Sequence, residues 1–143
     1  MIYKYTKNAC ENFFNNILGL EAEDCKTHRY KNFFYSKISI YTNDIKYDLL
    51  FFLKKETINL ISDILLFEKN PDEQIRIDLL KEVANLIGGT AKTLMEELDE
   101  ETEYTLSTPE YLGTIEDIKT LNLYQKFAKK VNNRCFVIAI EEE

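Results

Sequence analysis

The sequence is short of several residue types on which catalytic sites depend. Its 143 residues include no tryptophan, one histidine (His28), two prolines and four glycines. A Ser-His-Asp or Cys-His arrangement would have to be built around His28, which lies in a polar segment and is expected at the surface. The one glycine pair, Gly88-Gly89, is not set in a GxxxxGK[ST] or GxGxxG phosphate loop. These absences argue against triad hydrolases and against the common nucleotide-binding folds.

Positive charge and long apolar runs are also scarce. The formal net charge is −7, whereas nucleic acids and anionic membranes attract basic surfaces, so we expect neither as a partner. The longest apolar runs, residues 49–53 and 135–140, are much shorter than the roughly 20 residues that span a bilayer. The first seven residues lack the apolar core of a signal peptide. We therefore expect a cytoplasmic protein.

The cysteines are few and widely spaced. Cys10, Cys25 and Cys135 form no CxxC pair and no zinc-ligand spacing, and only His28 is available to complete a metal site. We expect three reduced thiols and no bound metal.

What the chain does contain is core material for one domain. Hydrophobic residues make up 45% of it, and nine Tyr and nine Phe provide bulky side chains. A chain of this length can bury a sizeable core. No linker or internal repeat divides it, so residues 1–143 are predicted to form a single domain.

The hydrophobic spacing alternates between helical and strand periods along the chain. Helical spacing predicts helices over 8–20, 54–67 and 75–98, with Asp72 as the cap of the last. Strand spacing predicts a hairpin of 33–41 with 45–53, a strand over 104–108 and a buried strand over 135–140. Residues 21–30 suit an edge strand, 111–122 a loop with a turn of helix, and 123–131 either element. Asn132-Asn133 suits a hairpin turn.

Helices interspersed with meandering strands favour an α/β fold of the α+β type. We expect a mostly antiparallel, twisted sheet with helices packed on one face.

The predicted helix over 75–98 carries an unusual polar row. Most of its circumference is apolar, but one row runs along it at alternating spacings of four and three residues. The members of that row are Asp78, Glu82, Asn85, Gly89, Lys92 and Glu96. Two glycines inside a helix destabilise it by about 1 kcal/mol each relative to alanine, so they need a reason. Either a partner approaches this face, or the row is a solvated surface and the glycines let a strand pack closely.

The row also carries a recognisable motif. Asp78-x3-Glu82-x2-Asn85, followed by Gly88-Gly89 and later by Ser107-Thr108-Pro109, resembles the CheC/CheX/FliY phosphatases of bacterial chemotaxis. Their signature is Asp or Ser, Glu four residues on, Asn three further, and Pro about two dozen residues downstream. Because the motif occurs once, the resemblance is to the CheX branch, and it implies the same CheX-like sheet-and-helix fold.

The resemblance implies a function and a set of roles. It implies hydrolysis of the phosphoaspartate of a CheY-type response regulator, with Asn85 orienting the attacking water and Glu82 docking on a lysine of the partner. Asp78, Gly89 and Pro109 would contribute to partner binding. The chain would need no cofactor of its own, because the regulator brings Mg²⁺, and it would form a homodimer. We expect an exposed strand, 33–41 or 135–140, to mediate that pairing.

The sequence leaves one other main function open, and it contains two weaker patterns. A docking or adaptor protein could bind a response regulator or a flagellar switch component through the same helix and hydrolyse nothing. A second Glu-x2-Asn spacing, Glu56 and Asn59, has Phe52 where Asp or Ser belongs, and we interpret it as coincidence. A glycosidase-like carboxylate pair is not singled out among the 25 acidic residues.

Overall fold

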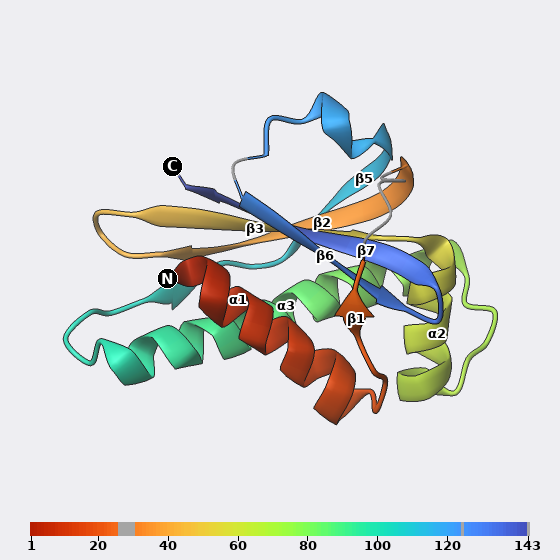
Figure 1. Ribbon diagram of the computed structural model, residues 1–143, viewed down its shortest axis with the longest axis horizontal. Helices are drawn as coiled ribbons and strands as arrows, with labels where there is room; N and C mark the ends of the chain where they lie inside the picture. Colours follow the sequence, from red (N-terminus) through yellow and green to blue (C-terminus); the bar gives the residue numbers. More distant parts are fainter. Residues whose placement is uncertain (26–30, 124, 143) are drawn as a thin grey trace.

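Helices cover one face of an antiparallel sheet, as Figure 1 shows. The computed structural model describes residues 1–25, 31–123 and 125–142. The helices are α1 (Ile2–Asn12), continued by a π-helical turn η1 (Phe13–Ile17), α2 (Lys55–Leu66), α3 (Glu73–Leu98) and a short 3-10 turn η2 (Ile118–Thr120). The strands are β1 (Glu23–Asp24), β2 (Lys31–Tyr41), β3 (Lys46–Leu53), β4 (Thr105–Leu106), β5 (Glu110–Asp117), β6 (Gln125–Val131) and β7 (Arg134–Glu142).

The sheet has seven strands in the order β1-β6-β7-β3-β2-β4, and β5 pairs with another part of β2. Every pairing is antiparallel. The predicted hairpin is present in full, with Ile38 of β2 opposite Leu49 of β3. The predicted fold class is therefore confirmed. None of the described helices is long and apolar enough to cross a membrane.

The core lies mainly between the sheet and the helices. Alternate residues of the central strands point to each face, so β3 places Phe51 under the helices and Phe52 on the opposite face. On the helix side, Phe14 of η1 stacks on Phe136 of β7 with ring centroids 4.5 Å apart. On the other face, Tyr35 stacks on Phe52 at 5.1 Å. Burial on both faces explains why the central strands read as nearly continuous apolar runs.

The long helix α3 forms as predicted. Asp72 caps it by accepting a hydrogen bond from the Ile75 backbone N–H at 2.9 Å, which satisfies one of the free N–H groups of the first turn. The first helix starts earlier than predicted, at Ile2 rather than at residue 8, because Ile2, Tyr5 and Ala9 form a buried stripe. In Figure 1, α1 (red) and α3 (green to teal) lie side by side and run in opposite directions.

Residues 111–122, for which the sequence pattern was weakest, form mostly a strand. Residues 111–122 were expected as a loop with a turn of helix, and the η2 turn is present, but β5 occupies Glu110–Asp117. This strand lies at the sheet edge with residues alternating between exposed and half-buried, so it lacks the apolar signal of a central strand. The ambiguous segment after it forms β6. The β6–β7 turn is confirmed, with φ of 49° at Asn132 and 62° at Asn133.

Two expectations about the strands were wrong or only partly right. Residues 33–41 and 135–140 were expected at a sheet edge, but β2 lies between β3 and the β4/β5 pair, and β7 lies between β3 and β6. The edge beside β2 is formed by β4 and β5, of which β5 is the longer strand. Of the segment 21–30, Glu23–Asp24 forms an edge strand as expected; residues 26–30, which include His28, lie outside the described residues.

The expectation of three free thiols was also wrong. Cys25 and Cys135 form a disulfide with their Cα atoms 5.9 Å apart, and Cys10 is free and buried. The sheet explains the pairing, because the Cys25 N–H donates to the Ala128 carbonyl of β6 and Cys135 lies opposite Lys130 of the same strand. The spacing of the cysteines in the sequence did not predict this disulfide, since the two residues are 110 positions apart.

Candidate functional site

The motif residues lie together on the solvent side of α3. Asp78 and Glu82 are exposed, and Asn85 and Gly89 are half-buried. The Gln74 amide donates to Asp78 Oδ1 at 3.0 Å. Within the described part of the chain, the side chains of Glu82 and Asn85 form no hydrogen bond or ion pair, and both are free to meet another molecule.

The opposite side of α3 is what holds this row in place. Leu80, Ala84, Ile87 and Ala91 are almost fully buried against the sheet. Gly88 allows the closest approach, because a Cβ on it would lie 2.8 Å from Cγ2 of Ile38 in β2. Strand packing therefore accounts for Gly88, as one of the two interpretations proposed. It does not account for Gly89, whose Cβ would meet only Leu106 at 3.9 Å.

Gly89 and Asn85 instead line a groove between α3 and α1. The groove has a volume of about 650 Å³. Its lining residues are Asn8 and Asn12 from α1 and Asn85, Leu86, Gly89, Thr90, Thr93, Leu94 and Glu97 from α3. Glu82 and Asp78 continue the exposed row of α3 outside the groove, one and two turns before Asn85.

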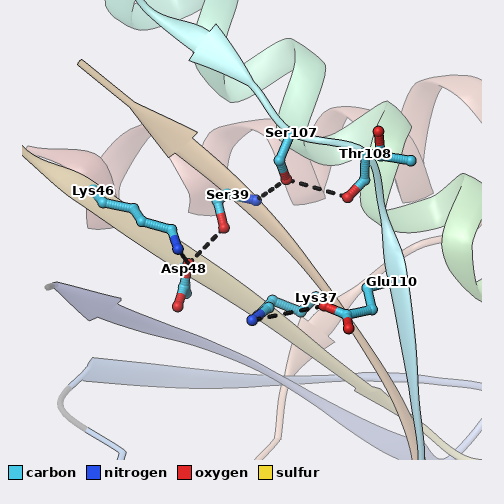
Figure 2. Close-up of polar contacts among 7 residues, drawn as sticks. All are labelled: Lys37, Ser39, Lys46, Asp48, Ser107, Thr108 and Glu110. Atoms are coloured by element: carbon cyan, nitrogen blue, oxygen red, sulfur yellow. Dashed lines mark hydrogen bonds and ion pairs between the residues drawn. The ribbon is translucent and has the colours of Figure 1, made fainter. Parts of the chain in front are cut away.

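Pro109 lies apart from this groove, in the link between β4 and β5. Figure 2 shows contacts of Ser107 and Glu110, which lie on either side of Pro109 in the sequence. The Ser39 N–H donates to Ser107 Oγ at 2.8 Å, and the Ser107 N–H donates to the Ser39 carbonyl at 2.9 Å. On the other side, Glu110 forms an ion pair of 3.8 Å with Lys37. Pro109 therefore lies in the link between two edge strands, β4 and β5, that both contact α3, although it does not line the groove itself.

The second Glu-x2-Asn spacing is also separate. Glu56 and Asn59 line a different cavity of about 530 Å³, between α2 and the β6–β7 turn. Phe52, which stands where the motif has Asp or Ser, is buried on the face of the sheet opposite the three α-helices. The two Glu-x2-Asn pairs therefore occupy different environments.

Two residues of the groove were missed in the sequence. Asn8 and Asn12 are four residues apart, which places them on one face of a helix. The sequence predicted a helix that begins at residue 8, from the apolar spacing further along, so Asn8 stood at its first residue and the pair was not noticed. The extension of α1 to Ile2 makes both residues part of a regular helical face that borders the groove.

The groove can bind another molecule and orient it, but it supplies neither a metal site nor a reactive nucleophile. Among the described residues, no group of three or more His, Cys, Asp or Glu could hold a metal ion. Burial raises the pKa of the free Cys10 thiol far above its ordinary value, and the nearby Lys129 offsets this only in part, so this thiol is a poor nucleophile. The walls are mostly apolar surface, with three neutral carboxamides, Asn8, Asn12 and Asn85, among the lining residues. Each carboxamide can donate and accept hydrogen bonds without repelling an anion.

Comparison with known proteins identifies the fold. No protein-family model matches the chain, and no curated protein matches it in sequence. Among solved structures, it is similar to the chemotaxis protein CheX of Vibrio vulnificus, with a TM-score of 0.81 at 15% identity, over 100% of this chain and 97% of that one. A CheC-like protein of a Shewanella species matches with a TM-score of 0.72 at 21% identity, over 98% and 97% of the two chains.

A third similar structure is a complex. CheX of Borrelia burgdorferi, solved with CheY, BeF₃ and Mg²⁺, matches with a TM-score of 0.71 at 13% identity, over 100% of this chain and 98% of that one. The chain thus has the fold of CheX and CheC-like proteins over its whole length, as the motif resemblance implied.

Proposed function

We propose that this protein is a phosphatase that hydrolyses the phosphoaspartate of a CheY-type response regulator and so ends a chemotaxis signal. The observation that carries the proposal is the pair Glu82 and Asn85. They lie one turn apart on the solvent side of α3, neither is engaged within the described chain, and the fold is that of CheX. The Borrelia burgdorferi CheX, which shares the fold, forms a complex with CheY.

Asn85 suits the hydrolytic step because acyl-phosphate hydrolysis needs a water placed in line behind phosphorus. Its Oδ1 accepts a hydrogen bond from that water, and its Nδ2 donates to a phosphoryl oxygen. A carboxylate at this position would repel the phosphoryl group, so an amide is the better choice. No residue of the chain attacks phosphorus, and no covalent intermediate forms on it.

Glu82 suits a docking role. A carboxylate repels a phosphoryl group, but it attracts a lysine of the partner's active site and so anchors α3 while Asn85 enters. Asp78 extends the same acidic edge by one turn. Mg²⁺ belongs to the regulator in this account, and it supplies charge neutralisation at the phosphoryl group. The cytoplasm, where such regulators act, is the proposed location.

The experiment measures how fast phosphorylated regulators lose phosphate. Each CheY-type regulator of the organism that carries this chain is phosphorylated with acetyl phosphate, the donor is removed, and decay is followed with and without the protein. The proposal predicts accelerated decay for at least one regulator. Decay unchanged for all of them would refute it.

A second candidate is the adaptor function, because Glu82 alone would be enough for docking. An adaptor would bind a regulator or flagellar switch component through α3 without changing the lifetime of the phosphoryl group. Binding without acceleration separates this function from the phosphatase.

We also propose a homodimer, as the resemblance implies. The strands expected to mediate it are interior, so the proposal moves to β5, which lies at the sheet edge and whose residues alternate between exposed and half-buried. Light scattering is expected to give about twice the monomer mass of 16.9 kDa. The monomer mass at high concentration would contradict it.

A further inference from the structure

The α1 wall of the groove is built from two asparagines that the motif does not include. Asn8 and Asn12 both line the groove, whereas the other members of its lining belong to α3. Residues four apart in a helix lie about 6 Å apart along the axis. Alternate residues of an extended chain are about 6.6–6.8 Å apart. Two carboxamides at this spacing match the alternate peptide groups of an extended segment.

The orientation of the Asn12 amide is fixed from outside the groove. Asn16 Nδ2 donates to Asn12 Oδ1 at 2.8 Å, so the oxygen is engaged and the Nδ2 donor is left for a ligand. The π-helical turn η1 follows directly after Asn12. In it, Phe13 and Phe14 are both buried while Asn16 remains exposed, which holds Asn16 where it can bind Asn12.

The remaining lining is mostly apolar, with Leu86 and Leu94 among its members, and it carries two hydroxyls and little charge. Thr90 Oγ1 and Thr93 Oγ1 each donate at 3.0 Å to a carbonyl of their own helix, Leu86 and Gly89 respectively. Their oxygens can therefore still accept from a ligand. Glu97 is the only ionisable residue among the described lining residues, and no cation lines the groove. Walls that are apolar with a few neutral hydrogen-bonding groups suit an uncharged segment, whose main chain meets those groups, better than an anion or a cation.

We propose that this groove binds an extended main-chain segment of the response regulator next to its phosphoaspartate, with Asn12 Nδ2 donating to a backbone carbonyl. The inference rests on the partner named in the proposed function. The bound segment lies next to the phosphoaspartate because the groove is continuous with the motif row: Asn85 and Gly89 belong both to that row and to the groove wall. A regulator that brings its phosphoryl group to Asn85 covers the groove mouth at the same time.

The experiment separates binding from hydrolysis. The probe is each CheY-type regulator loaded with beryllofluoride and Mg²⁺, which mimics the phosphorylated state and is not hydrolysed, so that Kd is measured directly. The variants are Asn12→Ala and Asn12→Asp; the aspartate keeps the acceptor for Asn16 but removes the donor. The control is Asn43→Asp, which makes the same charge change in the exposed β2–β3 turn.

Loss of one hydrogen bond at an interface predicts a Kd increase of about three- to tenfold for Asn12→Ala. A larger increase is expected for Asn12→Asp, because a carboxylate would face a carbonyl oxygen. When the concentration of phosphorylated regulator is varied, the Asn12 variants should show a raised KM and a kcat within about twofold of the parent, whereas Asn85→Ala should lower kcat. Asn43→Asp should leave both constants unchanged. Circular dichroism confirms that each variant is folded.

Other results overturn the proposal in distinguishable ways. Folded Asn12 variants that bind like the parent, while Asn85→Ala loses its rate, would refute the groove but not the phosphatase. Asn12-dependent binding without any acceleration of decay would refute the phosphatase but not the groove. A change in self-association alone would assign the groove to a second copy of this chain and refute it as a regulator site.

Discussion

Gly88 of α3 lies directly against Ile38 of β2, so that a Cβ on the glycine would be only 2.8 Å from Ile38 Cγ2. Both residues are buried, and Ile38 is branched at Cβ, so its methyl group cannot swing away freely. The contact fixes how close α3 approaches the sheet. It thereby sets the position of the motif row on the other side of the helix.

The glycine pair gives a matched test of this packing. We expect Gly88→Ala to lower the free energy of unfolding by about 1–2 kcal/mol, because overpacking outweighs the gain in helix propensity. Gly89→Ala has room for its Cβ and should be neutral or stabilising by up to about 1 kcal/mol. Urea denaturation of both variants measures the difference. Equal effects at the two positions would contradict the account.

Glu82 should control affinity for the activated regulator. Glu82→Ala should weaken binding, and Glu82→Lys should weaken it more, because it sets a cation against the partner's lysine. Breaking a desolvated charge pair at an interface typically costs about 2–5 kcal/mol. Isothermal calorimetry with beryllofluoride-loaded regulator measures the change.

The control for this prediction is Glu101→Lys, which makes the same charge change at an exposed residue beyond the end of α3. It should bind like the parent. If Glu82→Lys also binds like the parent, the helix does not dock as proposed.

The disulfide predicts a change in thiol count. Denatured, oxidised protein should react with one equivalent of a thiol reagent, at Cys10, and with three after reduction. Because the bond closes a long loop, its reduction should lower the free energy of unfolding by about 2–4 kcal/mol. Denaturation with and without a reductant measures this. Three reactive thiols before reduction would contradict the pairing.

Lys129 predicts a loss of stability at alkaline pH. Its Nζ lies 3.0 Å from Glu11 Oε1 and 2.9 Å from Asp24 Oδ1. Burial opposes its charge, but the hydrogen bonds that Lys129 donates to Asp24 and Glu11, together with their negative charges, outweigh this and raise the pKa of Lys129 above its ordinary 10.5. A raised pKa in the folded state means that the stabilisation is fully present below pH 10.5 and is lost as pH rises through the raised value.

The measurement is the free energy of unfolding between pH 8 and pH 11.5, for the parent and for Lys129→Met, which keeps most of the aliphatic side chain. The parent should lose stability more steeply above about pH 10. The variant should retain a shallower loss, because burial also raises the pKa of Tyr47, Tyr104 and Tyr111, which favours their neutral form when folded. Identical slopes would contradict this role of Lys129.

The sequence predicted the elements whose signals are local and strong. The α3 helix has a clear apolar period and a capping aspartate, and the β2–β3 hairpin has apolar strands around turn residues. Of the β6–β7 hairpin, the sequence predicted the buried strand β7 and indicated the Asn132-Asn133 turn, but it left residues 123–131 open between helix and strand. The edge strand β5 was missed because its residues are half-exposed and carry little alternation in hydrophobicity. Its position depends on pairing with β2, which is a tertiary property.

The same distinction applies to the candidate site. Asp78, Glu82, Asn85 and Gly89 were predicted together because one helix carries them all. The groove was not predictable, because it depends on how α1 packs beside α3 and therefore on Asn8 and Asn12, which are about 75 residues away in the chain. The Cys25–Cys135 pairing likewise depends on where β1 joins the sheet.

The most direct measurement of the central claim is the decay rate of phosphorylated regulator with saturating parent protein, Asn85→Ala and Asn85→Asp. If Asn85 orients the water, the parent accelerates decay, and Asn85→Ala loses about 10²–10³ of that acceleration while it still binds. Asn85→Asp should lose at least as much, because its charge repels the phosphoryl oxygens. The control Asn59→Ala, from the other Glu-x2-Asn spacing, should match the parent. An active parent with an equally active Asn85→Ala variant would contradict the account.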